Sequence, residues 1–268
     1  MDYFQAIVLA IIEGITEFLP VSSTGHMAIA SALFHNADNP FTKLFEIVIQ
    51  FGAILSVVAL YWKKFIHFKK IDFYIKLIIA IIPALAFGAV FKKHIDLVLE
   101  KPLFITTVIF AGGVLLLFVD NWFKQASIDK EEAISYKKSF FIGCYQVLAI
   151  LLPGLSRSAA TIIGGMQQKL TKAAAAEFSF FLAVPTMFAA TIKSIYDIWK
   201  EEPAILNTNG ISTLLLGSLI AFVVALLAIR FFIKFIKVNG FRIFGWYRII
   251  LGLVLFALIF SGKLSMNV

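Results

Sequence analysis

Residues 13–26 read Glu13-Gly-Ile-Thr-Glu-Phe-Leu-Pro-Val-Ser-Ser-Thr-Gly-His26 and lie inside an otherwise apolar stretch that runs from 3 to 34. A charged side chain at the centre of a membrane costs about 2.5 to 3.5 kcal/mol, so it needs a cation, a partner or water. Glu13 and Glu17 are one helical turn apart and share a face, where their like charges repel. The pair therefore predicts a functional site that holds a divalent metal ion or an arginine.

Apolar residues dominate the whole chain of 268 residues, with 60% hydrophobic residues and a mean hydropathy of +0.92. The N-terminus has no basic segment followed by a small-residue cleavage site, so we expect the first apolar stretch to remain in the mature protein. Composition excludes a soluble fold and predicts one integral membrane domain, 1–268, that is all-α and polytopic. Apolar runs of about 20 residues, which cross a bilayer as helices, occur at 44–62, 74–91, 103–120, 173–196, 211–233 and 244–262.

Two further apolar stretches, 3–34 and 139–168, are each interrupted midway by proline and small hydroxyl residues, at 20–25 and 153–158. Proline ends a helix because it lacks an N–H and its ring clashes with the preceding turn. Interrupted backbone is tolerated at membrane depth only where protein or a water-filled cavity covers it. We therefore predict six transmembrane helices plus two re-entrant broken-helix segments whose interruptions line a polar pocket.

Basic residues predict the orientation. If both broken segments return to the side from which they enter, three basic loops lie on one face, which the positive-inside rule makes the cytoplasmic face. Both termini are then outside. The loops also explain the net charge of +8, and they favour contact with anionic membrane lipids over nucleic-acid binding. The loop residues are Lys63, Lys64, Lys69 and Lys70; Lys124, Lys130, Lys137 and Lys138; and Arg230, Lys234, Lys237, Arg242 and Arg248.

The two halves, 1–120 and 139–268, are expected to form inverted-topology repeats, because the first broken segment enters from outside and the second from inside. Inverted repeats place their binding site near the middle of the membrane, where the broken helices meet. A constant offset of 133 residues supports the pairing, since it sets Glu13, Leu19, Pro20 and Ser23 opposite Gln146, Leu152, Pro153 and Ser156.

The junction would bring acidic and hydroxyl groups of the first segment to an arginine and hydroxyl groups of the second. New helices begin after both breaks, and their N-termini and the Arg157 guanidinium suit a phosphate or diphosphate. A cation held by Glu13 and Glu17 would bridge two phosphates. His26 lies three residues after Ser23, so its imidazole is expected to activate that hydroxyl or a water; which of them attacks stays open. The expected substrate-binding residues are Ser22, Thr24, Ser156, Ser158 and Thr161.

Each of these residues also has a purely structural interpretation. Ser22, Thr24 and Ser158 follow a proline and could cap helices. His26 could be a hydrogen-bonded structural residue near the membrane interface. Arg157 could form a buried salt bridge with Glu13 or Glu17 that holds the halves together. The whole cluster is harder to explain in this way, because many costly polar groups converge on one predicted junction.

The stretch from Glu13 to His26, with Pro153-Gly-Leu-Ser-Arg-Ser158 and Thr161 downstream, resembles the two signature motifs of the bacterial undecaprenyl-diphosphate phosphatase (bacitracin-resistance protein) family. Length and hydrophobic profile agree over the whole chain. The resemblance implies hydrolysis of undecaprenyl diphosphate to undecaprenyl phosphate and inorganic phosphate, which recycles the lipid carrier for cell-wall and peptidoglycan synthesis. It also implies Mg²⁺ or Ca²⁺ dependence and a site that opens to the outer side of the bacterial cytoplasmic membrane. By motif, Glu17, Ser23, His26 and Arg157 would be catalytic, with Glu13 assisting at the metal.

One alternative belongs to another functional class. A secondary transporter or flippase for a phosphorylated lipid or an anion would also use inverted repeats with broken helices. A passive scaffold would leave the acidic pair and Arg157 unexplained. The sequence leaves open the oligomeric state, a homodimer included, and whether the protein also flips its lipid.

Overall fold

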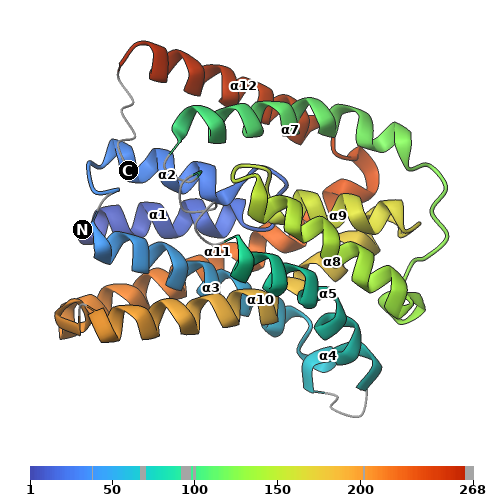
Figure 1. Ribbon diagram of the computed structural model, residues 1–268, viewed down its shortest axis with the longest axis horizontal. Helices are drawn as coiled ribbons and strands as arrows, with labels where there is room; N and C mark the ends of the chain where they lie inside the picture. Colours follow the sequence, from blue (N-terminus) through green and yellow to red (C-terminus); the bar gives the residue numbers. More distant parts are fainter. Residues whose placement is uncertain (38, 67–70, 92–97, 99–100, 202, 263–268) are drawn as a thin grey trace.

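The computed structural model describes residues 1–37, 39–66, 71–91, 98, 101–201 and 203–262. Nearly all of them are helical, and apart from an isolated bridge between Ile128 and Leu170 no β-structure occurs among them (Figure 1). The elements are α1 (Tyr3–Thr16), α2 (Ser23–Leu33), α3 (Pro40–Leu60), α4 (Trp62–Ile66), α5 (Ile71–Val90), α7 (Pro102–Trp122), η1 (Glu131–Ala133), α8 (Tyr136–Leu151), α9 (Arg157–Gln167), α10 (Lys172–Glu201), η2 (Pro203–Leu206), α11 (Thr208–Asn239) and α12 (Arg242–Phe260).

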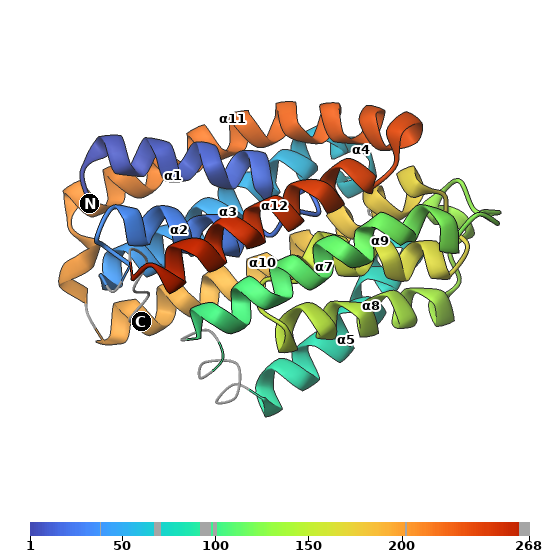
Figure 2. The same ribbon diagram turned by 90° about the horizontal axis from the view of Figure 1, so that it is seen from above.

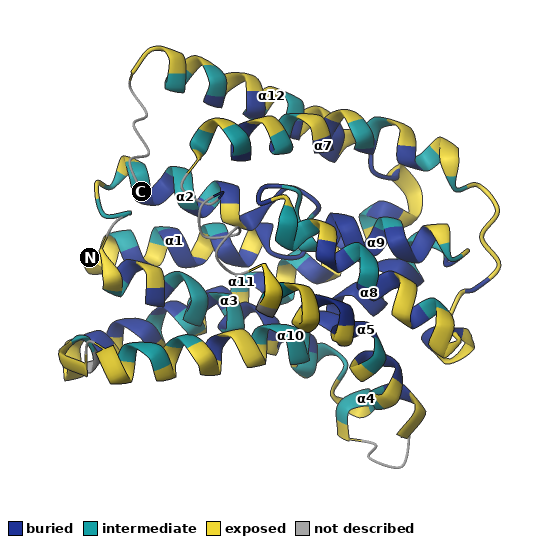
Figure 3. Ribbon diagram, in the orientation of Figure 1, coloured by how far each residue is buried: buried dark blue, intermediate teal, exposed yellow. Residues whose placement is uncertain are grey.

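Six of the described helices are long and apolar enough to cross a membrane, namely α3, α5, α7, α10, α11 and α12. They coincide with the six runs predicted from the sequence and confirm a polytopic all-α fold. Their outward faces are exposed (Figure 3) and carry large apolar side chains such as Ile78, Leu215 and Leu227. Such faces suit contact with lipid chains, so the chain is a multi-pass membrane protein.

The two interrupted stretches each form a pair of shorter helices, α1 with α2 and α8 with α9. Within each pair the helices pack against one another, and the two pairs approach from opposite ends of the molecule so that their connecting turns meet at its centre (Figures 1 and 2). The predicted interruptions are therefore real breaks in the helices. Whether each pair is re-entrant with respect to a bilayer stays a prediction, as does the assignment of 1–120 and 139–268 as repeats.

The two breaks share an unusual local geometry. Ser22 and Ser156 are the N-caps of α2 and α9, with φ of 73° and 75°, and each side chain accepts a hydrogen bond from the backbone N–H three residues on, at 3.3 Å. Positive φ is uncommon for a residue with a side chain and marks strain at functional sites. The sequence register set Ser23 opposite Ser156, whereas the structure gives Ser22 the equivalent cap position, one residue earlier.

The three basic loops predicted to share one face lie at the same end of the molecule. The N-terminus and the end of α12 lie at one end in Figure 1, and α4, the segment before α8 and the turn between α11 and α12 lie at the other. This arrangement agrees with the predicted grouping of loops, although Lys69 and Lys70 lie outside the described residues. The placement of Arg248 in that group is wrong, because its side chain is 0% exposed and reaches the centre of the fold.

Arg248 ties both breaks to α7. Its guanidinium donates to five backbone carbonyl oxygens and to no carboxylate among the described residues. Burying a guanidinium charge without a carboxylate partner is costly. Here the five carbonyl oxygens offset that cost, because the guanidinium has five N–H groups and makes five hydrogen bonds. The glycine at 112 makes room, since a Cβ there would lie 2.4 Å from Arg248 Nη2. The acceptors are Pro20 (3.2 Å) in the first break, Gly154 and Leu155 (2.8 Å each) in the second, and Val108 (3.3 Å) and Ile109 (3.1 Å) in α7.

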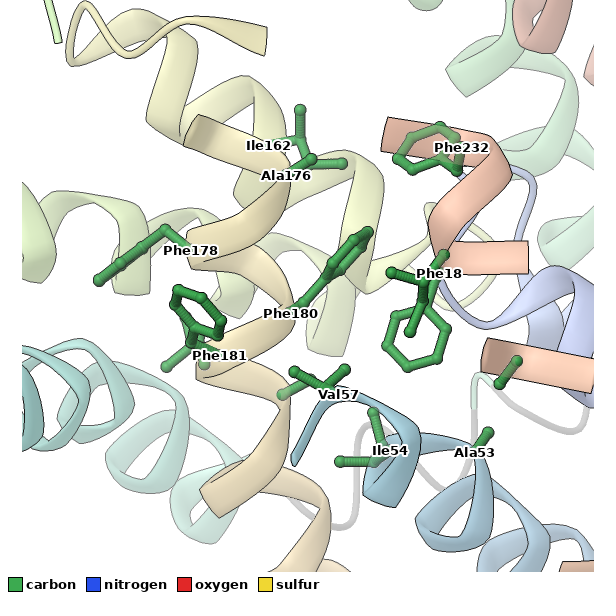
Figure 4. Close-up of a cluster of buried hydrophobic side chains, with 14 of the residues drawn as sticks. Phe18, Ala53, Ile54, Val57, Ile162, Ala176, Phe178, Phe180, Phe181 and Phe232 are labelled. Atoms are coloured by element: carbon green, nitrogen blue, oxygen red, sulfur yellow. The ribbon is translucent and has the colours of Figure 1, made fainter. Parts of the chain in front are cut away.

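Aromatic packing fixes the first break from its other side. Phe18, directly after α1, is fully buried beside Phe180 of α10 and near Phe232 of α11 (Figure 4). The rings of Phe18 and Phe180 meet edge to face, with centroids 5.0 Å apart. Such pairs add about 0.5 to 1.5 kcal/mol to the burial of the rings. The turn that follows α1 is therefore anchored in the core.

Replacing Arg248 by lysine should loosen both breaks, because an ammonium keeps the charge but has three donors on one atom and cannot span five carbonyls. Hydrogen bonds to charged groups are worth about 1.5 to 3 kcal/mol each, so the thermal unfolding temperature in detergent should fall by about 5 °C or more. Arg242→Lys, at the exposed start of the same helix, is the matched control. Equal unfolding temperatures for the two variants would contradict this role of Arg248.

Candidate active site

The two breaks are joined by contacts between their side chains. Arg157, the first residue of α9, donates from Nη2 to Glu17 Oε1 at 2.8 Å, and the side chains are only 14% and 6% exposed. Ser158 donates from Oγ to the carbonyl oxygen of Leu19 at 2.9 Å. An acid of the first segment thus meets the arginine of the second at the centre of the fold.

Glu17 uses both of its carboxylate oxygens in this junction. Its second oxygen, Oε2, accepts a hydrogen bond from Ser23 Oγ at 2.6 Å. The other half of the guanidinium is held as well, since Arg157 Nη1 donates to the carbonyl oxygen of Ser179 at 3.2 Å. A hydroxyl that points its proton at a buried carboxylate is arranged for deprotonation, as in an activated nucleophile.

His26 lies beside this group but has other partners. Its Nδ1 is 2.8 Å from the carbonyl oxygen of Ser22, so Nδ1 carries a proton, and Nε2 is 2.6 Å from the hydroxyl of Tyr247 on α12. The two rings are stacked, with centroids 5.6 Å apart and an interplanar angle of 7°. The expected pairing of His26 with Ser23 is therefore absent, because the ring folds back one helical turn to Ser22, and Ser23 pairs with Glu17 instead.

A cavity of about 290 Å³ opens over the junction. Polar groups of both breaks line it, together with three polar residues for which the sequence predicted no role in the site: Gln50 of α3, Gln146 of α8, which the repeat register had set opposite Glu13, and Thr186 of α10. Ala149, Ile150 and Met187 make up an apolar part of the wall. From the two breaks the lining comprises Glu17, Ser22, Ser23, Thr24, Pro153, Gly154, Ser156 and Arg157.

Ser158 and Thr161, which the sequence suggests as substrate-binding residues, are fully buried and are not among the lining residues. Thr161 Oγ1 lies 2.9 Å from the carbonyl oxygen of Arg157 and 2.6 Å from Ser179 Oγ. Together with the bond from Ser158 to Leu19, these contacts brace the start of α9. In this geometry the two hydroxyls position Arg157 and do not face the cavity.

Glu13 is the least satisfied polar group of the site. Its side chain is 0% exposed, and no N–H or hydroxyl donor among the described residues reaches either carboxylate oxygen. The Glu17 carboxyl is close enough for a hydrogen bond when one of the two acids carries a proton. The charged groups that act on it are Glu17, Glu46 and Arg157. Of these, Glu46 accepts a hydrogen bond from Ser31 Oγ at 2.5 Å.

Two orphaned oxygens beside a second carboxylate fit a hard divalent cation, which prefers oxygen ligands. No group of three or more His, Cys, Asp or Glu side chains with metal-binding geometry occurs in the described part of the chain. Magnesium sites commonly use only one or two carboxylates, with water and substrate phosphates as the other ligands. Glu13 is fully buried and is not among the residues that line the cavity, so of the two acids only Glu17 faces the space where a phosphorylated substrate would lie. The pair still offers the hard oxygen ligands that a divalent cation prefers.

Comparison with known proteins agrees with the geometry. The family described as bacitracin resistance protein BacA matches residues 6–254. The undecaprenyl-diphosphatase of Flavobacterium psychrophilum is 56% identical over 255 residues, which cover 95% of each chain. Those of Porphyromonas gingivalis and Bdellovibrio bacteriovorus are 49% and 47% identical, over 98% of each chain. By this match over nearly its whole length, the chain belongs to the bacitracin resistance protein BacA family.

Proposed function

We propose that this protein is an undecaprenyl-diphosphatase, which hydrolyses undecaprenyl diphosphate to undecaprenyl phosphate and inorganic phosphate. The observation that carries the proposal is the buried Glu17 carboxylate, which accepts from the Ser23 hydroxyl and from Arg157 at the wall of one cavity. Relatives that share up to 56% of their residues with this chain are named for that activity. The product is the lipid carrier that cell-wall synthesis consumes, which connects the activity to bacitracin resistance.

Ser23 is the nucleophile of the proposed reaction. Its Oγ attacks the terminal phosphorus, its proton passes to Glu17, and the bond to the bridging oxygen breaks so that undecaprenyl phosphate leaves with that proton. Arg157 keeps its charge at ordinary pH and neutralises the phosphoryl oxygens as charge develops. His26 and Tyr247 do not line the cavity, and their stacked, hydrogen-bonded pair joins α2 to α12.

The apolar wall of the cavity suits the polyprenyl chain. Ala149, Ile150 and Met187 line it on α8 and α10, and the next residues on these helices, Leu148 and Phe188, are exposed on the outer surface. A lipid tail can therefore run from the polar junction toward the surrounding bilayer without crossing polar groups. The substrate would enter sideways from the membrane, with its diphosphate leading.

A divalent cation, Mg²⁺ or Ca²⁺, belongs to the proposal. Glu13 and Glu17 would hold it, and when bound it would supply positive charge that offsets the negative charge of the phosphates. The orphaned oxygens of Glu13 support this assignment, because an unpaired buried carboxylate is otherwise strongly unfavourable.

The proposed location is the bacterial cytoplasmic membrane, with the site open to the outer side. The support comes from charge, since the end of the molecule opposite the termini carries the basic loops and should face the cytoplasm. Anionic lipids of the cytoplasmic leaflet would attract these basic loops.

Purified protein in detergent with Mg²⁺ or Ca²⁺ should release inorganic phosphate from undecaprenyl diphosphate. Arg157→Lys should lower kcat/KM about 100-fold or more, because it loses one arm of the fork that reaches Glu17 and the phosphate. Arg230→Lys, an exposed arginine on α11, is the matched control and should leave the rate unchanged. Absence of phosphate release with both metals, while the lipid is moved across vesicles, would favour the transporter instead.

Glu13→Gln should weaken cation binding, because an amide offers one oxygen and no charge. The dissociation constant of Mn²⁺, used as a paramagnetic probe and measured by electron spin resonance, should rise about 10-fold or more, with a parallel rise in the metal concentration needed for activity. Glu201→Gln on the exposed end of α10 is the control. The same Mn²⁺ affinity in wild type and Glu13→Gln would remove Glu13 from the metal site.

A further inference from the structure

Gln146 of α8 is a polar residue of the cavity wall that the proposed reaction does not yet use. Its side chain is 1% exposed and lines the cavity, and its amide oxygen Oε1 is buried without a hydrogen-bond partner among the described residues. We propose that Gln146 is a positioning residue that holds the water which hydrolyses a phosphorylated Ser23. The inference rests on the proposed function and deepens it.

The orientation of the amide follows from its neighbour. Thr186 Oγ1 donates its only proton to the carbonyl oxygen of Leu182 at 2.8 Å. Toward Gln146 it can therefore only accept, and it does so from Nε2 at 3.4 Å. The reverse orientation of the amide would set two acceptors against each other. Oε1 is thus the atom left for a partner in the cavity.

That partner must be a hydrogen-bond donor. An unpaired buried acceptor costs about 1 to 3 kcal/mol, so the site gains by filling it. No donor among the described residues reaches Oε1, and the Ser23 hydroxyl and Arg157 Nη2 are directed to Glu17 instead. An ionised phosphate has only acceptors and is not attracted to Oε1. Water is the reactant that brings O–H donors into this cavity.

The hydrolytic step balances with the groups present. The water oxygen bonds to phosphorus as the bond from phosphorus to Ser23 Oγ breaks, and inorganic phosphate leaves. One water proton passes to Glu17, which returns a proton to Ser23 Oγ. The other stays on the phosphate. Gln146 changes neither charge nor protonation; its oxygen accepts a hydrogen bond from the water and so aims the lone pair at phosphorus.

The test separates the two halves of the reaction. Gln146→Met keeps the length of the side chain but removes the acceptor, so formation of phosphorylated Ser23 should proceed at the wild-type rate while its hydrolysis slows about 10-fold. Rapid mixing should then show a burst of undecaprenyl phosphate equal to one per enzyme, followed by slow turnover. Label from the terminal phosphate should remain on the protein, and Ser23→Ala should abolish that label.

Two further variants make the result decisive. Thr186→Val removes the acceptor that orients the amide and should give a smaller burst of the same kind, even if Gln146→Met fails to fold. Gln167→Met, an exposed glutamine on α9, should behave as wild type. The proposal is overturned if Gln146→Met slows both steps equally, if it changes Mn²⁺ affinity as a metal ligand would, or if no burst appears. Wild-type protein that releases no phosphate would instead refute the proposed function.

Discussion

The structure depends on the burial of two interrupted backbones in a largely apolar protein. Each break frees carbonyl groups that no helix satisfies, and water is scarce at that depth. Arg248 answers this need from α12, because its planar guanidinium donates to the carbonyl oxygens of Pro20 in one break and of Gly154 and Leu155 in the other. The same group bonds to two carbonyls of α7. One side chain thus sets the distance between the breaks on which the site relies.

Because the two breaks are held close together, Glu17 of the first break contacts Arg157 of the second and lies at the centre of the candidate site. Its carboxylate accepts from Arg157 on one oxygen and from the Ser23 hydroxyl on the other, so a proton acceptor lies directly beside that hydroxyl. The salt bridge between Arg157 and Glu17 would by itself only hold the two halves of the protein together, which is the structural interpretation of Arg157. The hydroxyl on the second oxygen and the cavity above it support the catalytic role that we propose for the pair.

Unsatisfied atoms mark what the protein must still bind. Most polar groups of the junction are paired, as folding requires, and the exceptions that concern the site are the oxygens of Glu13 and Oε1 of Gln146. A carboxylate with two free oxygens calls for a cation, whereas a neutral amide oxygen calls for a donor such as water. The two exceptions therefore motivate the two proposals made for this site, a divalent cation at Glu13 and a water at Gln146.

The amino-acid sequence by itself determined the spans, the two breaks and the presence of acids opposite Arg157, because hydropathy and proline act locally and leave readable patterns. It also carried the motifs by which the family was recognised. Only the tertiary structure decided that Ser23 pairs with Glu17 and that His26 pairs with Tyr247, 221 residues away. The tertiary structure also decided that Arg248 is buried, although in the sequence it lies close to the basic turn between α11 and α12. It likewise decided that Gln146 lies beside Thr186. These contacts join helices whose rotation and depth are set by packing, and no short-range pattern in the chain encodes them.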